Sequence, residues 1–165
     1  SPTALSAVVA SSTAMTAVAA SSTAMTAVIA SPTALSAVVA SSTAMTAVNN
    51  NNTALDALYN SSLTTKVNYS STALWSSEVT LRNGAGLFVR LTSKAGCAGW
   101  GEGSVSTNEW MNYDGSNVYY AERNANPYNH TAASSSPRLP ARKFNSALKI
   151  RPYMAVEIAY IPLSS

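Results

Sequence analysis

The chain has 165 residues and a formal net charge of +3, and only 10% of its residues are charged. The positive charges are scattered, which argues against nucleic-acid binding, because that function needs basic residues clustered on one face. The single cysteine, Cys97, excludes an internal disulfide. Serine and threonine interrupt every apolar run, so no membrane insertion is predicted.

Residues 1–60 are six tandem decapeptides of the form S-x-T-A-M/L-x-A-V or a close variant. Thr and Ala hold places three and four throughout, no charge occurs before Asp56, and no aromatic occurs before Tyr59. A strict period is typical of repeat arrays. We therefore predict a decapeptide-repeat shaft over residues 1–75 and a β-rich C-terminal tip domain over residues 76–165.

Two conformations compete for the repeats. In a helix, places four, five, seven and eight share one side, but ten residues at about 100° each displace that side by about 80° per repeat. Ser1-Pro2 and Ser31-Pro32 match an N-cap followed by proline at the first helical position, and Ser11, Ser21 and Ser41 can cap in the same way. We predict about two helical turns per unit, ended and recapped at the next serine. The alternatives are β-strands of an intertwined triple-stranded fibre, because ten is a multiple of two, or a flexible linker.

Helices this short are marginal alone in water and need partners. A neutral array with a small apolar face suits bundling with identical chains. The predicted fold class is therefore α+β: an elongated homotrimeric fibre with short helical repeats and a compact β-rich tip. Since Ser1 lies within an already regular repeat, we also expect a distal fragment of a longer protein.

Strand and turn patterns replace the repeat after residue 75. Ser77–Arg82 and Leu87–Thr92 alternate polar and apolar residues on either side of the glycine-containing turn Asn83–Gly86. Such a pattern predicts a β-hairpin.

Further strands are expected towards the C-terminus. Trp110–Tyr113, Asp114-Gly115 and Val118–Tyr120 suggest a second hairpin, and Ala147–Leu163 is predicted to form a final strand pair. One face of that pair is expected to carry Met154, Val156, Ile158 and Tyr160.

The decapeptides resemble the repeats found in long tail fibres of tailed bacteriophages and related prophages. The resemblance covers residues 1–60, where Ser, Thr, Ala and Val recur in register. It implies a trimeric fibre in the virion tail with a C-terminal tip that binds the bacterial surface. The implied partners are further copies of the chain, a bacterial surface polysaccharide or outer-membrane protein, and other tail-fibre or baseplate proteins.

Aromatic and amide residues gather in the middle of the tip domain. Exposed aromatic rings stack on sugar faces, and amides hydrogen-bond hydroxyl groups in both directions. A glycan-binding surface is therefore predicted, with packing in the core or in a trimer interface as the alternative role. The candidate receptor-binding residues are Trp100, Trp110, Tyr113, Tyr119, Tyr120, Tyr128, Asn126 and His130.

Catalysis and cofactor binding are not predicted. His130 is the only histidine and lies far in the sequence from Cys97, so neither a nucleophilic triad nor a zinc-ligand spacing is present. Glu102, Glu109 and Asp114 leave a small glycan hydrolase as an alternative, since two carboxylates suffice for that chemistry. The remaining alternative is a purely structural trimerisation and folding cap. The leading prediction is multivalent attachment by a non-enzymatic tail fibre without cofactor or metal.

Overall fold

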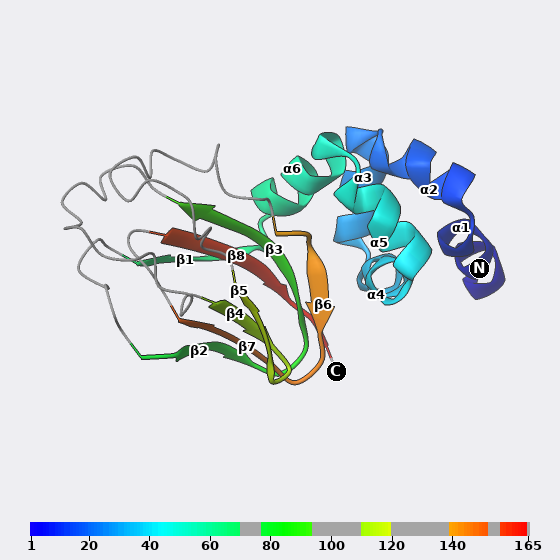
Figure 1. Ribbon diagram of the computed structural model, residues 1–165. Helices are drawn as coiled ribbons and strands as arrows, with labels where there is room; N and C mark the ends of the chain where they lie inside the picture. The colour runs from blue at the N-terminus through cyan, green and yellow to red at the C-terminus, as the bar shows by residue number, and fades with distance from the viewer. Residues whose placement is uncertain (70–76, 94–109, 120–138, 152–155, 165) are drawn as a thin grey trace. The chain divides into compact units, whose positions relative to one another are not determined.

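A computed structural model shows an α+β fold, as predicted, in two compact units (Figure 1). The helical unit comprises Ser1–Thr64 with Pro140–Lys143, and the β unit comprises Thr65–Leu139 with Phe144–Ser165. The division after Thr64 lies ahead of the boundary at residue 75 that the sequence suggests. The structure describes residues 1–69, 77–93, 110–119, 139–151 and 156–164.

Each decapeptide forms one short helix. The helices are α1 Pro2–Ala10, α2 Ser12–Ala19, α3 Ser22–Ala30, α4 Pro32–Ala40, α5 Ser42–Asn49 and α6 Asn52–Asn60. Their N-caps are Ser1, Ser11, Ser21, Ser31, Ser41 and Asn51. The prediction of separate helices recapped at each junction is therefore confirmed, and the alternative of β-strands is wrong.

The junction at Ser11 shows why the helices break where they do. Its backbone N–H donates to the Val8 carbonyl at 3.1 Å and ends α1, while its hydroxyl accepts from the Ala14 N–H at 3.2 Å and begins α2. Ser11 itself is extended, with φ −96° and ψ 115°. One residue thus satisfies orphan groups of two helices, and the axes of α1 and α2 meet at 91°.

The helices stack on one another three repeats apart. Each contacts its sequence neighbours, and the pairs α1–α4, α2–α5 and α3–α6 lie in contact. The hydroxyl of Ser41 donates to the Val9 carbonyl at 2.7 Å and so links the second turn of helices to the first. The array is thus a solenoid with three helices per turn.

A longer period in the sequence matches this turn. Ser1–Ala10 and Ser31–Ala40 are identical, so the proline-containing decapeptide returns after three units. The ten-residue period alone does not reveal this recurrence at thirty residues.

The helices find their partners within the chain, which corrects the physical reason given for bundling with identical chains. The buried side chains belong mainly to places four, five, eight and nine of the repeat. They are Met15, Ala19, Met25, Ile29, Leu35, Val38, Val39, Ala44, Val48, Ala54, Leu55 and Leu58. Stacking of successive turns therefore buries an apolar core that no single decapeptide could form.

The C-terminal end of the array has a polar clamp. Asn49 stands at place nine, where the corresponding residues of α3 and α4 are Ile29 and Val39. Its side-chain amide donates to the Ala141 carbonyl at 3.0 Å, and its side-chain oxygen accepts from the Ala141 N–H at 2.8 Å. A strand-like pair of hydrogen bonds thus holds Pro140–Lys143 within the helical unit.

The strands form two antiparallel four-stranded sheets (Figure 1). The first has the strand order β1-β8-β3-β6 and the second β2-β7-β4-β5. The strands are β1 Thr65–Tyr69, β2 Val79–Asn83, β3 Gly86–Ser93, β4 Trp110–Tyr113, β5 Ser116–Tyr119, β6 Arg142–Phe144, β7 Ala147–Arg151 and β8 Val156–Pro162.

The predicted first hairpin is wrong in its pairing, although both strands exist. β2 pairs with β7, whereas β3 pairs with β8 in the other sheet. Gly84, with φ +114°, lies in the link, and its N–H donates to the Ser146 carbonyl at 2.7 Å. The link therefore carries the chain from one sheet to the other.

The other two strand predictions have different outcomes. The hairpin β4–β5 is confirmed, and its turn places Asp114 at φ 52° and Gly115 at φ 91°. The final strand pair is wrong because β7 and β8 belong to different sheets. Three of the residues expected on one face are buried in β8, whereas Met154 lies outside the described residues. The three are Val156, Ile158 and Tyr160.

One apolar core joins the inner faces of the two sheets. Phe88 of β3 meets Tyr113 of β4 edge to face, with ring centroids 5.5 Å apart. The Tyr160 hydroxyl donates to the Leu81 carbonyl at 3.1 Å. A Cβ at Gly86 would overlap with the ring of Phe144, so glycine is needed there for close packing. The buried core residues are Phe88, Met111, Tyr113, Phe144, Leu148, Ile150, Val156, Ile158 and Tyr160.

Candidate binding face

The outer side of the sheet β2-β7-β4-β5 carries polar and aromatic residues. Met111 and Tyr113 of β4 point into the core, so Trp110 and Asn112 lie on the opposite side by strand alternation. The same alternation places Lys149 and Arg151 of β7 on that side. We name this surface the Trp110 face; its described members are Glu78, Thr80, Trp110, Asn112, Asn117, Lys149 and Arg151.

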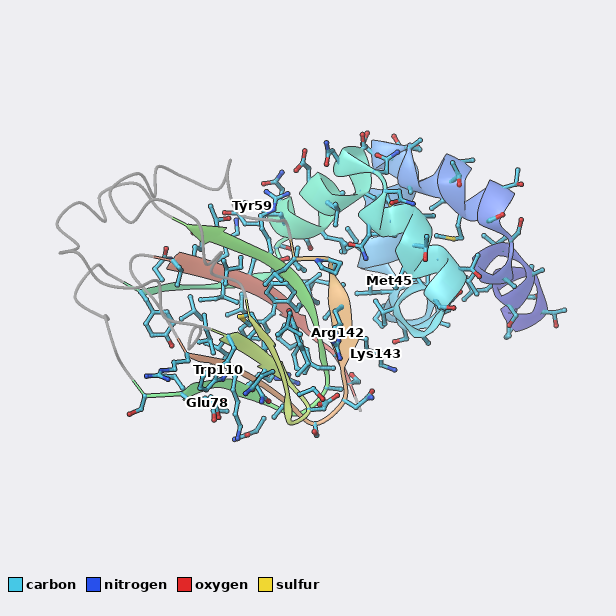
Figure 2. The ribbon with its side chains drawn as sticks, in the orientation of Figure 1. Met45, Tyr59, Glu78, Trp110, Arg142 and Lys143 are labelled. Carbon is cyan, nitrogen blue, oxygen red and sulfur yellow. The ribbon has the colours of Figure 1, made fainter. Side chains whose placement is uncertain are left out.

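Strand register brings the central groups together. Trp110 is the direct partner of Arg151, and the guanidinium carbon lies 5.2 Å from the indole centroid. The indole N–H donates to Glu78 Oε2 at 2.7 Å, and Figure 2 labels both residues. Lys149 Nζ lies 3.9 Å from Glu78 Oε1. The indole is therefore held by a cation–π contact and a charge-assisted hydrogen bond.

This arrangement suits recognition by contact and charge. Trp110, Lys149 and Arg151 are half-buried and Glu78 is exposed, and the side-chain exposures of Glu78 and Lys149 are 33% and 39%. One carboxylate and two cations leave a positive balance on the face. An indole beside guanidinium and ammonium groups can bind hydroxyl-rich or anionic ligands.

Asn112 has a structural role in this face. It is only 7% exposed; its Nδ2 donates to Asn117 Oδ1 at 2.6 Å, and its Oδ1 accepts from the Gly115 N–H at 3.0 Å. These bonds hold the β4–β5 hairpin and so fix the strand that carries Trp110.

Asp114, one of the carboxylates considered for glycan hydrolysis, is committed to the backbone. Its Oδ1 accepts from the N–H groups of Ser146 and Ala147 at 2.6 and 3.1 Å, and Oδ2 accepts from that of Asn145 at 2.8 Å. The Ser146 hydroxyl also donates to Oδ1, at 2.9 Å. Desolvation raises the pKa of Asp114, but these hydrogen bonds outweigh it and lower the pKa to about 2. A carboxyl group with that pKa is ionised at neutral pH and cannot serve there as a general acid. Glu102 and Glu109 lie outside the described residues.

The predicted receptor-binding residues have different positions. Trp110 lies on the outer face, whereas Tyr113 is 3% exposed and belongs to the core, the alternative role that the sequence left open. Tyr119 pairs with Trp110 through its backbone, and its side chain is not described. The residues outside the described part of the chain are Trp100, Tyr120, Asn126, Tyr128 and His130.

Sequence reasoning missed Glu78, Lys149 and Arg151. The alternation of Ala147–Arg151 places two cations on one side of a strand and two apolar residues on the other. It does not show that this side lies beside Trp110, because that depends on the pairing of β7 with β4.

The helical unit contains a hollow of about 440 Å³ between α3, α6 and the residues after α6. The described lining has no charged side chain, and its polar side chains are three hydroxyl groups and one amide. The lining residues are Thr26, Ile29, Ala30, Ala57, Asn60, Ser61, Ser62 and Leu63.

Two searches over the described residues complete the survey of sites. No group of three or more His, Cys, Asp or Glu side chains in that part of the chain could hold a metal ion. No single helix described is long and apolar enough to cross a membrane, while α1 with α2 and α3 with α4 reach the required length and hydropathy only as sharply bent pairs. Comparison of the chain with models of protein families, with curated proteins and with solved structures finds no match.

Proposed function

We propose that this chain is a component of a phage tail fibre whose β unit binds a bacterial surface glycan through the Trp110 face. The helical repeats serve as a spacer in this proposal. The observation that carries it is the indole of Trp110, held between the Arg151 guanidinium and the Glu78 carboxylate on the outer side of the sheet. The resemblance of residues 1–60 to tail-fibre decapeptides supports the virion location.

The chemistry of the face favours an acidic polysaccharide. Indole and guanidinium planes pack against sugar rings, and the guanidinium also binds carboxylate and phosphate groups in a bidentate manner. Lys149 adds a second cation to the same face. No catalytic step is needed for attachment.

Multivalency gives weak individual contacts their strength in this proposal. Several copies held on one fibre convert later binding steps into intramolecular ones, which raises overall avidity without new contacts. We retain a homotrimer as the proposed assembly. Because the repeat helices already pack within one chain, the mass of the full chain in solution is the direct test of this assembly.

Binding to purified polysaccharides tests the glycan function. The full chain and Trp110→Ala would be compared by biolayer interferometry on a panel of bacterial lipopolysaccharides and capsular polysaccharides. We expect saturable binding to at least one acidic polysaccharide and a loss of tenfold or more on Trp110→Ala and on Lys149→Ala. Lys66→Ala is the matched control, because it removes the same charge from an exposed position on the other sheet. Equal binding by the native chain and Trp110→Ala, or no binding across the panel, would refute the proposal.

A specific contact favours a second function, that of a folding cap. The Asn49 clamp ties Pro140–Lys143 to the C-terminal end of the repeat array. Terminal repeats of solenoids need such polar closure. Assembly that fails on Asn49→Ala, in a chain that shows no polysaccharide binding, would support the cap function over attachment.

A further inference from the structure

Within the part of the chain that the structure describes, places four and eight of the repeat are more exposed in the first turn of the solenoid than in the second. Val18 and Val48 occupy place eight in two helices whose first seven residues are identical. Val48 is fully buried, whereas Val18 is only partly buried. Both helices have a preceding and a following helix, and among the described elements the main difference between them is that α5 presents places four and eight to a helix of another turn, α2.

The same contrast recurs around the array. At place eight, Val8 and Val28 are exposed or partly buried, whereas Val38 and Leu58 are buried. We define the leading face as the side chains at places four and eight of the first turn. Its members are Ala4, Val8, Ala14, Val18, Ala24 and Val28.

The second turn shows what covers such a face. The first turn, α1–α3, packs against the second turn, α4–α6. At this contact the side chains at places five and nine of α2 and α3 are buried. Those two places carry Met15, Ala19, Met25 and Ile29. Side chains at places four and eight of one turn therefore pack against apolar side chains at places five and nine of the turn before it.

The N-cap of α1 matches the N-cap of α4. The Ser1 hydroxyl accepts from the Ala4 N–H at 3.2 Å, the same bond and distance as between Ser31 and Ala34. Helix α4 follows α3 through one extended serine, Ser31. Because residues 1–10 have the same sequence as residues 31–40, the Ser1 cap is compatible with the junction that joins two helices of the array.

A second copy of the chain is a poorer occupant. Its first turn already uses places five and nine against its own second turn. At the end of its array, place nine of α5 is Asn49, which is bound to Ala141. The leading face is also neutral, since no charged side chain occurs before Asp56, so it offers nothing to a charged partner.

We propose that the leading face is a docking surface for one further turn of decapeptide repeats, which stacks on α1–α3 in the way that α1–α3 stack on α4–α6. This inference is independent of glycan binding and of the Trp110 face. It predicts that the solenoid is extended by whole turns through the same contacts that join its first and second turns.

An elongated full chain tests the proposal. Residues 1–30 would be duplicated ahead of Ser1, and amide hydrogen exchange would be followed by mass spectrometry. We expect exchange in α1, α2 and α3 to slow tenfold or more, to the level of α4 and α5 in the native chain. The matched control carries the same added thirty residues with serine at places five and nine, and should leave exchange in α1–α3 unchanged.

A second measurement separates docking from a general effect of added length. In the elongated chain, Val18→Ala should lower the thermal midpoint of unfolding about as much as Val48→Ala does. In the native chain, Val18→Ala should lower it clearly less than Val48→Ala does. Equal exchange in α1–α3 of the elongated and control chains would overturn the proposal. Protection of α1–α3 in the native chain that rises with protein concentration would also overturn it, because a second copy would then be the occupant.

Discussion

Two identical decapeptides provide a matched test of the solenoid. Val8 and Val38 have the same ten-residue context, but their exposures are 38% and 3%. Val→Ala removes the same two methyl groups and gains the same small helix propensity at both sites, so that gain cancels in the comparison. Only the surroundings of the removed groups differ.

The expected difference follows from burial. Fully burying a valine stabilises by roughly 1.5–3 kcal/mol, so the additional burial of Val38, 38 minus 3 or 35 percentage points, accounts for about 0.5–1 kcal/mol. The cavity left in a packed site adds a further term of similar size. Val38→Ala should therefore lower the free energy of unfolding by about 1–2 kcal/mol more than Val8→Ala.

Urea denaturation of the full chain, followed by circular dichroism at 222 nm, measures both variants. Val8 lies in the first helix, where fraying reduces any effect, so Val18→Ala and Val48→Ala provide a second pair away from the end. Val48→Ala should again be the more costly of the two. If Val8→Ala and Val18→Ala cost as much as their partners, identical chains must cover the first turn in solution, and stacking within one chain would not explain the array.

Three further predictions concern single contacts. Asp114→Asn should lower the free energy of unfolding by about 1 kcal/mol at pH 7, after allowance for solvent screening. The pKa of Asp114 in the folded chain, about 2, lies below its ordinary value of 3.8. The ionised carboxylate therefore stabilises the fold above pH 4, and this stabilisation is lost as the pH falls through 2. Urea midpoints at pH 7, 4 and 2.5 check this, and a difference from the native chain that does not shrink with acid would contradict it. Asn49→Ala should lower the free energy of unfolding by about 1–3 kcal/mol, because the buried backbone N–H and carbonyl of Ala141 both lose their hydrogen-bond partners. Hydrogen exchange at the Ala141 amide should accelerate, and unchanged exchange would argue against the clamp. Gly86→Ala should lower the free energy of unfolding by about 1–3 kcal/mol, because the added methyl group overlaps with the ring of Phe144. In a double-mutant cycle, combination with Phe144→Leu should recover part of that loss. Strict additivity of the two changes would show that the sites are independent.

The helical repeats were predictable because their limits are local. A serine that can cap identifies the starts of the first five helices without knowledge of distant residues, and at two of these starts proline follows the serine. The same signals do not predict which helices pack against one another. The ten-residue pattern shows which side of each helix is apolar, but it does not show which other helix covers that side. The recurrence of Ser31–Ala40 as a copy of Ser1–Ala10 carried that information.

The β unit shows a similar division. Alternation identified the strands on both sides of Gly84 and at Ala147–Arg151, but alternation specifies a face and not a neighbour. The one hairpin that was predicted correctly, around Asp114-Gly115, has a turn that demands positive φ at both positions.

The candidate site was predictable only in part for the same reason. Composition pointed to both Trp110 and Tyr113, yet residues three apart on a strand lie on opposite sides. Glu78 and Arg151 join Trp110 through cross-strand register, which no local pattern in this chain reveals.

The three-helix turn also constrains how the array can change in length. Gain or loss of one decapeptide would preserve every serine cap, yet it would rotate the first helix by about a third of a turn about the array axis. Gain or loss of thirty residues would change the distance along that axis and leave the azimuth of the first helix unaltered. Insertions and deletions that keep both ends of the array in their original orientations are therefore restricted to multiples of three repeats, although the shortest repeated sequence is a single decapeptide.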